Sequence, residues 1–300
     1  MTGHAAPRLQ ILVAALLFST GGAAIKATAL SSWQTAGFRS GIAAVVFLLF
    51  LPAARRGWSL RVLAVGTAYA ATLVLFVLAN RLTTAANTIF LQSTAPLYIL
   101  LLGPWLLGER TRARDAAFMA LVGAGLLLFF VGAEAPSVTA PDPARGNLLA
   151  TASGVFWALT VMGLRWLGSR EESGDAAVAT VAAGNVIAFL ACLPLALPVG
   201  EVGGLDWGIV VYLGVFQIAL AYWFVTTAIR HLSALEASVL LLAEPALNPI
   251  WAWAVHGERP GPWAVAGGVL ILGTTLAKTW WDGRADVAEG AGGGGAPAPP

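Results

Sequence analysis

The clearest chemical group in this sequence is an acidic side chain in the middle of an apolar stretch. Glu244 lies near the centre of residues 235–256, with Asn248 one helical turn further on and Trp251 two turns further on. Residues spaced in this way share one face of an α-helix. They would form a polar wall for a cation or an ammonium group, and Glu244 is also a candidate proton carrier. The alternative is a protonated or paired carboxyl that only joins helices.

Other polar side chains also fall near the centres of apolar stretches. Residues 84–107 contain Asn87, Gln92 and Tyr98, with Asn87 and Tyr98 on one helical face. Each is a candidate for substrate binding, and the alternative for each is an ordinary hydrogen bond between helices, worth about 0.6 kcal/mol. The remaining polar groups at such positions are Tyr69, Asn185, Gln217 and Tyr222, of which we add Gln217 and Tyr222 to the binding candidates.

Three prolines within these stretches, Pro96, Pro245 and Pro249, predict helix kinks. Proline has no backbone N–H and clashes with the carbonyl four residues earlier in a helix. The carbonyls of Gln92 and Leu241 should therefore be left free at Pro96 and Pro245. Free carbonyls of this kind would add acceptors to a polar wall.

Several charged residues lie within or at the ends of the apolar stretches. Arg39 is about two turns from an end, deep enough to pair with Glu244, with another residue or with an anionic substrate. Lys26 is nearer to an end, and we expect its ammonium group to extend to water. Glu109 and Glu258 each close a stretch beside an arginine, and we expect them to be boundary or capping residues.

Motifs of enzymes and metal sites are missing from the sequence. There is no His-Glu-x-x-His zinc motif, no Gly-x-Ser-x-Gly elbow and no P-loop. The histidines, His4, His231 and His256, lie at the terminus or at helix ends and are too scattered for a metal cluster. We therefore predict no catalytic residue, no metal and no cofactor.

The composition indicates that the solvent of this chain is mostly lipid. Of its 300 residues, 58% are hydrophobic and 11% are charged, and the mean hydropathy is +0.78. A soluble domain carries about 25% charged residues. The formal net charge of +2 gives no indication of nucleic-acid binding. A single cysteine, Cys192, excludes an internal disulfide.

The apolar stretches have the length of membrane spans. A helix needs about 20 apolar residues to cross roughly 30 Å of hydrocarbon. Charged or Pro/Gly-rich breaks divide the chain into ten such stretches, at residues 9–28, 33–51, 60–79, 84–107, 113–131, 147–167, 175–197, 205–229, 235–256 and 262–278. Membrane β-strands alternate in polarity, whereas these stretches are apolar on every side. We predict an all-α membrane protein with ten transmembrane helices.

The basic residues predict an orientation. With the N-terminus in the cytoplasm, twelve Lys and Arg residues fall on the cytoplasmic side and five toward the opposite side. The richest loops are residues 55–61 and 110–114. An excess of Lys and Arg marks cytoplasmic loops. We expect both termini in the cytoplasm and the protein in the cell membrane.

The two halves of the sequence can be aligned with each other. At a shift of 149 residues, eight of the 32 residues from 79 to 110 are identical. The marks that coincide are Arg81 with Arg230, Ala85 with Ala234, Pro96 with Pro245, and Gly-Glu-Arg at 108–110 with the same tripeptide at 257–259. At a different shift, Phe18 and Lys26 correspond to Trp157 and Arg165.

Each half contains five predicted helices, and this odd number requires the second half to enter the membrane in the opposite orientation. The basic loop at 55–61 agrees, because its counterpart at 199–206 has no Lys or Arg. Inverted repeats are typical of secondary transporters, whose two halves move around a site near the membrane midplane. We therefore predict two inverted-topology five-helix repeats.

These segments resemble the drug/metabolite transporter superfamily, specifically its EamA-type members. The resemblance rests on residues 79–87, Pro96 and 107–109 in the first half, and on Ala234, 243–245 and 256–258 in the second. It covers about residues 9 to 280. It implies ten helices in two EamA repeats, a cavity lined by helices 1, 3, 4, 6, 8 and 9, and transport of amino acids, metabolites or drug-like molecules. Glu before the second proline is frequent in similar sequences, which leaves a structural role for Glu244 open.

These observations give an expected domain organisation and function. The first repeat should cover residues 1–132, an external linker 133–146, the second repeat 147–281 and a disordered cytoplasmic tail 282–300. The expected partners are a small-molecule substrate, the lipid bilayer and a proton or other coupling ion; a homodimer is left open and nucleic acid is excluded. We expect export or exchange by alternating access. The alternatives are a channel, a non-transporting membrane protein or an intramembrane enzyme.

Overall fold

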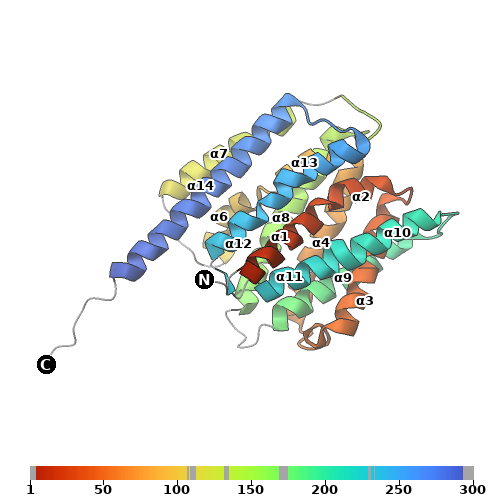
Figure 1. The fold of residues 1–300 in the computed structure, drawn as a ribbon, viewed down its shortest axis with the longest axis horizontal. Coiled ribbons are helices and arrows are strands. Elements are labelled where there is room, and N and C mark those ends of the chain that lie inside the picture. Colours follow the sequence, from red (N-terminus) through yellow and green to blue (C-terminus); the bar gives the residue numbers. More distant parts are fainter. Residues whose placement is uncertain are drawn as a thin grey trace.

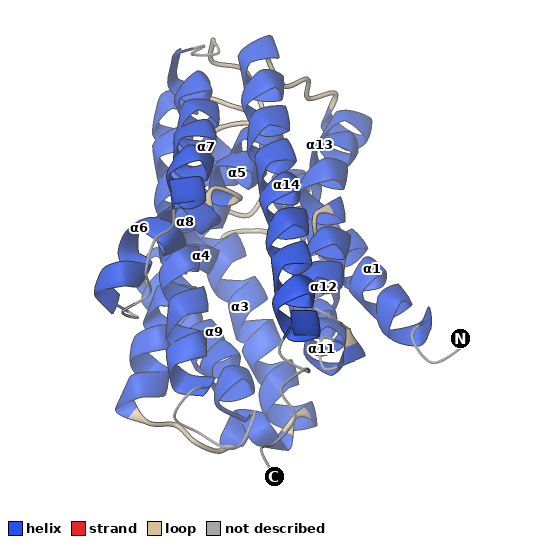
Figure 2. Ribbon diagram, turned by 90° about the vertical axis from the view of Figure 1, so that its left-hand side faces the viewer, coloured by secondary structure: helices blue, strands red, loops and turns tan. Residues whose placement is uncertain are grey.

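The chain is helical almost throughout (Figures 1 and 2). The computed structural model describes residues 5–106, 108, 113–131, 135–168, 175–228, 231–232 and 234–292. Within these ranges the β-structure is limited to an isolated bridge between Ser137 and Ala140. The prediction of an all-α protein is confirmed. The helices are α1 (Ala5–Ser19), α2 (Gly21–Ala27), α3 (Ser32–Phe50), the 3-10 helix η1 (Pro52–Arg55), α4 (Leu60–Leu82), α5 (Ala85–Gln92), α6 (Ala95–Leu106), α7 (Ala113–Val131), α8 (Pro143–Gly168), α9 (Asp175–Ala196), α10 (Gly204–Tyr212), the π-helix η2 (Leu213–Leu220), α11 (Ala221–Ala228), α12 (Ala234–Leu241), α13 (Ala243–His256) and α14 (Pro262–Gly292).

Seven helical segments are long and apolar enough to cross a membrane. They are Ala6–Ala27, Ser32–Phe50, Leu60–Leu82, Ala85–Leu106, Pro143–Gly168, Ala176–Ala196 and Gly204–Ala228. The prediction of ten spans is met for these seven only. Asp115–Val131 is apolar but shorter, and the ninth predicted stretch is divided at Leu242 into α12 and α13.

Hydroxyl side chains start several of the helices. Ser31, Ser59 and Thr84 each accept a hydrogen bond from the backbone N–H three residues later, at the starts of α3, α4 and α5. Ser31 also forms a capping box with Gln34. Such caps provide hydrogen-bond partners for N–H groups that have none within the helix. A backbone N–H without a partner is costly in a membrane, where no water can replace the hydrogen bond.

Two of the long helices are interrupted at matching positions of the two halves. The break between α5 and α6 falls at Ser93–Thr94, and the break between α12 and α13 falls at Leu242. Pro96 and Pro245 follow these breaks, so α5 and α12 end at the residues whose carbonyls the prolines were predicted to free. Pro249, by contrast, lies inside α13 without ending it.

The helices of the two halves pack against each other rather than forming two separate bundles. Helix α4 lies against α8 and α9, α3 against α9, and α1 against α11 and α13. Helices α7 and α14 run side by side at one edge of the molecule (Figure 1). Small residues permit the close approach of α4 and α9: a Cβ built on Gly66 would lie 3.2 Å from the backbone nitrogen of Gly184.

Many large apolar side chains face outward, as expected for a protein surrounded by lipid. Phe50 is 75% exposed and Trp105 is 88% exposed. A soluble protein rarely exposes so many apolar side chains, because large apolar patches promote association. This surface agrees with the composition and with the apolar spans.

The C-terminal helix is longer than the sequence indicated. Helix α14 continues to Gly292, whereas we expected residues 282–300 to form a disordered tail. Its continuation past Trp281 includes Ala, Arg and Glu residues, which are good helix formers and can extend a helix that already exists. The rest of the predicted tail, residues 293–300, lies outside the described residues.

Candidate functional site

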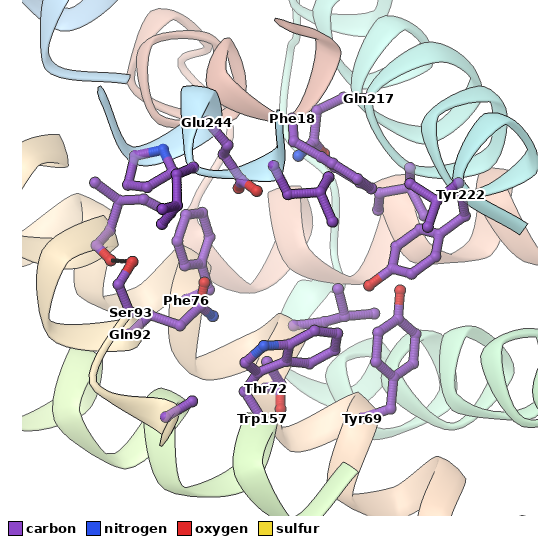
Figure 3. Close-up of a pocket in the computed structure, with 18 of the residues that line it drawn as sticks. Phe18, Tyr69, Thr72, Phe76, Gln92, Ser93, Trp157, Gln217, Tyr222 and Glu244 are labelled. Carbon is purple, nitrogen blue, oxygen red and sulfur yellow. Dashed lines mark hydrogen bonds between the residues drawn. The ribbon is translucent and has the colours of Figure 1, made fainter. Parts of the chain in front are cut away.

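A cavity of about 330 Å³ lies among helices from both halves of the chain (Figure 3). It borders both helix breaks, at Ser93 and Leu242. Its lining includes the predicted helices 1, 3, 4, 6, 8 and 9, with additional side chains from α3 and α14. The residues that line it are Phe18, Arg39, Tyr69, Thr72, Leu73, Phe76, Ile89, Gln92, Ser93, Ala95, Pro96, Trp157, Gln217, Ile218, Tyr222, Val225, Leu241, Leu242, Glu244, Pro245 and Thr275.

Glu244 supplies a carboxylate to this cavity. It is the second residue of α13, directly after the break at Leu242. Figure 3 shows its carboxylate facing the cavity, with Gln92 and Ser93 on one side and Tyr69 and Tyr222 on the other. Glu244 has no ion-pair partner within the described ranges of the chain. Its carboxylate is therefore available to a ligand or a proton.

Arg39 supplies a basic group to the same cavity. Its side chain is 1% exposed, and its guanidinium donates a 3.0 Å hydrogen bond to the carbonyl oxygen of Leu73. Its Nε has no hydrogen-bond partner in the described part of the chain. Of the partners that the sequence left open for Arg39, Glu244 forms no ion pair with it among the described residues. Arg39 is instead anchored on the α4 backbone, with donor capacity left over.

Aromatic rings form much of the remaining wall. The ring of Tyr222 lies 5.1 Å from that of Phe18 and 5.7 Å from that of Tyr69, both edge to face. Phe76 and Trp157 line the cavity as well. Rings in these arrangements are mutually stabilising, and their faces attract cations. The wall can therefore accept a flat or cationic group.

Two amide side chains are held in place at the edge of the cavity. Gln92 donates a 2.8 Å hydrogen bond to Ser153 Oγ, which in turn donates to the carbonyl of Thr72 at 3.1 Å. Gln217, on the π-helix, lies against Gly21, where an added Cβ would be 2.8 Å from Gln217 Nε2. Its Oε1 is buried without a hydrogen-bond partner among the described residues.

Four of the predicted site residues lie outside the cavity. Asn248 is fully buried beside Gly22, and Trp251 donates a 2.9 Å hydrogen bond to Ser19 Oγ. Asn87 donates to Thr83 and Asn147. Tyr98 packs against apolar side chains of the core. Glu244, Asn248 and Trp251 thus share a helix, but of the three only Glu244 lines the cavity.

A buried ion pair lies beyond the cavity. Lys26 Nζ is 2.6 Å from Glu258 Oε1, and the two side chains are 4% and 3% exposed. The expectation that Lys26 reaches water is therefore wrong. Lys26 also donates to the carbonyls of Thr83, at 2.8 Å, and Thr139, while Glu258 Oε2 accepts the N–H of Ala85 at 2.9 Å.

The sequence shows two matching segments when it is compared with known families. The sequence model of the EamA-like transporter family matches residues 8–131 and 144–277. The chain belongs to the EamA-like transporter family. It is a multi-pass membrane protein, and the resemblance found in its sequence motifs is confirmed.

Solved structures share the fold of this EamA-like chain. One, titled only as the crystal structure of a protein, is 22% identical, covers 94% of this chain and 99% of its own, and superimposes with a TM-score of 0.62. At this identity the likeness shows the fold alone. No curated protein matches the chain.

Some residues of the cavity and of the nearby ion pair could not be recognised from the sequence. Phe18, Thr72 and Phe76 are ordinary residues of apolar helices, and only packing brings them together. The Lys26–Glu258 pair joins residues 232 positions apart, so no local pattern predicts it. The Gly-Glu at 257–258 was a usable signal, because the repeat singled it out. Its counterpart Glu109 lies outside the described residues.

Proposed function

We propose that this protein is a secondary transporter that exports or exchanges a small metabolite, amino acid or drug-like molecule across the cell membrane. The observation that carries the proposal is the cavity between the two helix breaks, with the Glu244 carboxylate facing it. Membership of a transporter family supports it. A charged group at membrane depth is costly and is expected to serve a function.

Alternating access around this cavity requires two halves of related structure. If the broken and composite helices count as single spans, each half has five, and the second half is inverted. The packing supports such a relation: the first span contacts the eighth and ninth (α1 with α11 and α13), and the sixth contacts the third and fourth (α8 with α4, α5 and α6). Exchanging the halves converts one set of contacts into the other.

The excess of Lys and Arg supports placing both termini in the cytoplasm. In this orientation the Lys26–Glu258 pair lies toward the outer side of the membrane. The shorter and interrupted segments, 113–131 and 235–256, would then complete the ten spans together with α14.

The chemistry of the cavity supports coupling through Glu244. An ionised carboxylate binds an ammonium group or a cation, and a protonated carboxyl releases that ligand. A carrier in which proton and substrate compete for one carboxylate exchanges the two across the membrane. Arg39 would hold an anionic group of the substrate, and the aromatic wall would hold its apolar body.

The substitution Glu244→Gln tests this proposal. It keeps the size and hydrogen-bonding capacity of the side chain but removes the exchangeable proton and the charge. A comparative screen measures metabolite levels inside and outside cells with and without the protein, and so reports substrate and direction together. Cells with the parent protein should differ from cells without it. We expect cells with Glu244→Gln to resemble cells without the protein.

The matched control is Glu236→Gln on α12, where the carboxylate pairs with Arg8 at an exposed position. This change should leave the metabolite profile as in the parent protein. If Glu244→Gln gives the parent profile with unchanged pH dependence, Glu244 is not the coupling residue.

A further inference from the structure

The Lys26–Glu258 pair connects the two repeats at one end of the molecule. Lys26 belongs to the first matched segment and Glu258 to the second. The hydrogen bonds of the pair add the turn between α4 and α5 and the segment around Thr139. Glu258 directly follows the end of α13 and accepts a hydrogen bond from the first residue of α5. Each of these two helices borders one of the helix breaks beside the cavity. The pair sits where relative motion of the halves would separate it.

Close packing lies next to the pair, on the side of the cavity. Gly22 is one helical turn before Lys26 on α2, and a Cβ on it would lie 2.7 Å from Asn248 Oδ1 and 2.9 Å from the Cβ of Ala85. Helices α2, α5 and α13 are therefore in direct contact at this point, and the side chains of the pair are 4% and 3% exposed.

The buried amide of Asn248 is poorly satisfied in this closed arrangement. Asn248 is 0% exposed, and neither Oδ1 nor Nδ2 has a hydrogen-bond partner in the described part of the chain. A buried polar group without a partner is destabilising relative to the same group in water. Opening this end would hydrate the Asn248 amide and both members of the ion pair. This hydration would offset the loss of the contacts that these side chains make in the closed arrangement.

The cavity extends toward the opposite end. Asp206 accepts the N–H of Ala29 at 2.6 Å, so α10 begins near the ion pair and α11 ends away from it. Val225, near the end of α11, lines the cavity. The pair that joins the repeats at this opposite end, Arg8 with Glu236, is exposed, and exposed pairs contribute little to stability.

We propose that the Lys26–Glu258 pair is the gate at the outer end of the cavity and breaks in every transport cycle. The gate is closed in this structure, which corresponds to the state with the cavity facing the cytoplasm. Charged groups suit this role, because water stabilises them once they separate, whereas a dry apolar contact gains nothing from hydration. The proposal rests on the alternating-access function proposed above.

A thiol reporter in the cavity tests the gate without knowledge of the substrate. Cys192 is the single cysteine and is buried, so Cys192→Ala with Ser93→Cys leaves one thiol, at the cavity wall. A membrane-impermeant methanethiosulfonate reagent is added to whole cells, for the outer side, or to inside-out vesicles, for the inner side. In the parent reporter we expect labelling at least tenfold faster from the inner side.

Removal of the pair should make the reporter accessible from outside. Glu258→Gln keeps an acceptor for the Ala85 N–H, and the double variant Lys26→Met, Glu258→Gln avoids an unpaired buried charge. We expect outer labelling to rise about tenfold in both. Lys26→Arg, which keeps the charge, and Arg8→Gln, at the opposite end, should label as the parent does.

Two results would overturn the gate. One is a parent reporter that labels equally fast from both sides. The other is either neutralised variant labelling from outside at the parent rate while it retains the parent's thermal stability. Both results are independent of metabolite transport, so failure of the gate is distinguishable from failure of Glu244→Gln in the screen.

Discussion

Glu244 and Arg39 line the same cavity without pairing with each other, and the two residues differ in how they are held. Arg39 is buried and donates to one backbone carbonyl, whereas Glu244 stands at the start of a helix beside a break. The desolvation free energy of a buried guanidinium is only partly compensated by one hydrogen bond. A buried cation that is poorly compensated indicates a function other than stability.

The variant Arg39→Met separates these two roles. Methionine has a similar length and no charge, so we expect the thermal stability to be unchanged or higher. Transport of the molecule found in the metabolite screen should fall about tenfold, equivalent to about 1.4 kcal/mol of lost binding. Vesicle uptake and a thermal melt measure the two effects.

The comparison is Arg81→Met, which removes hydrogen bonds of 2.8 Å and 2.7 Å to the carbonyls of Thr28 and Leu30. This change should lower stability. A large drop in the stability of Arg39→Met, with transport reduced only in proportion to the folded protein, would assign Arg39 a structural role.

Polar groups that interrupt apolar stretches were the basis of most of the predicted site. Of these residues, Glu244, Arg39, Gln92, Gln217 and Tyr222 line the cavity, whereas Asn87 and Tyr98, chosen on the same ground, do not. Helical spacing alone did not place Asn248 or Trp251, because neighbours on α1 and α2 occupy that part of α13. Tertiary packing decides which neighbouring helix a side chain faces, and this cannot be predicted from the spacing of residues along one helix.

At the scale of elements, the breaks in the helices shape the cavity. Pro96 and Pro245 made two of them predictable, since each removes a hydrogen bond and clashes with an earlier carbonyl. The break between α1 and α2 at Thr20 has no proline; Ser19 and Thr20 instead donate to the carbonyls of Leu16 and Leu17 at 2.7 Å. Hydroxyl side chains in a helix often form such hydrogen bonds without ending it, so this break could not be predicted from the residues.

The end of α13 depends on one glycine conformation. Gly257 has a φ of +68°, and its N–H bonds the carbonyl of Trp253 at 2.9 Å, which turns the chain toward Glu258. Gly108 has a φ of +69° at the matching place of the first repeat. Left-handed backbone is accessible to glycine and strained for other residues.

We therefore expect Gly257→Ala to destabilise the protein by about 1–2 kcal/mol. The strain arises from the backbone, because a Cβ at this position has no neighbour within 4 Å. Gly208→Ala is the control, since it has equal space but lies within α10 and should be neutral or stabilising. A thermal melt of the two variants compares them, and equal melting temperatures would show that the turn carries no strain.

For the whole molecule, the two repeats explain why one cavity forms where the two broken helices meet. Hydropathy and the repeat predicted the helical membrane fold and the pairing of the halves. Neither predicted that Lys26 and Glu258 meet across 232 residues, because each lies in a segment whose own sequence is consistent with exposure at a helix end. The contact exists only once both repeats are assembled.

Counterflow in proteoliposomes distinguishes a carrier made of the two assembled repeats from a channel. Purified protein is reconstituted, the vesicles are loaded with an excess of the unlabelled molecule identified in the screen, and a trace of the labelled molecule is added outside. A carrier predicts transient accumulation of label above equilibrium, saturable and abolished by Glu244→Gln if proton and substrate share that carboxylate. Passive entry that rises only to equilibrium, with or without the internal load, would show that the protein is not a carrier and would favour a channel.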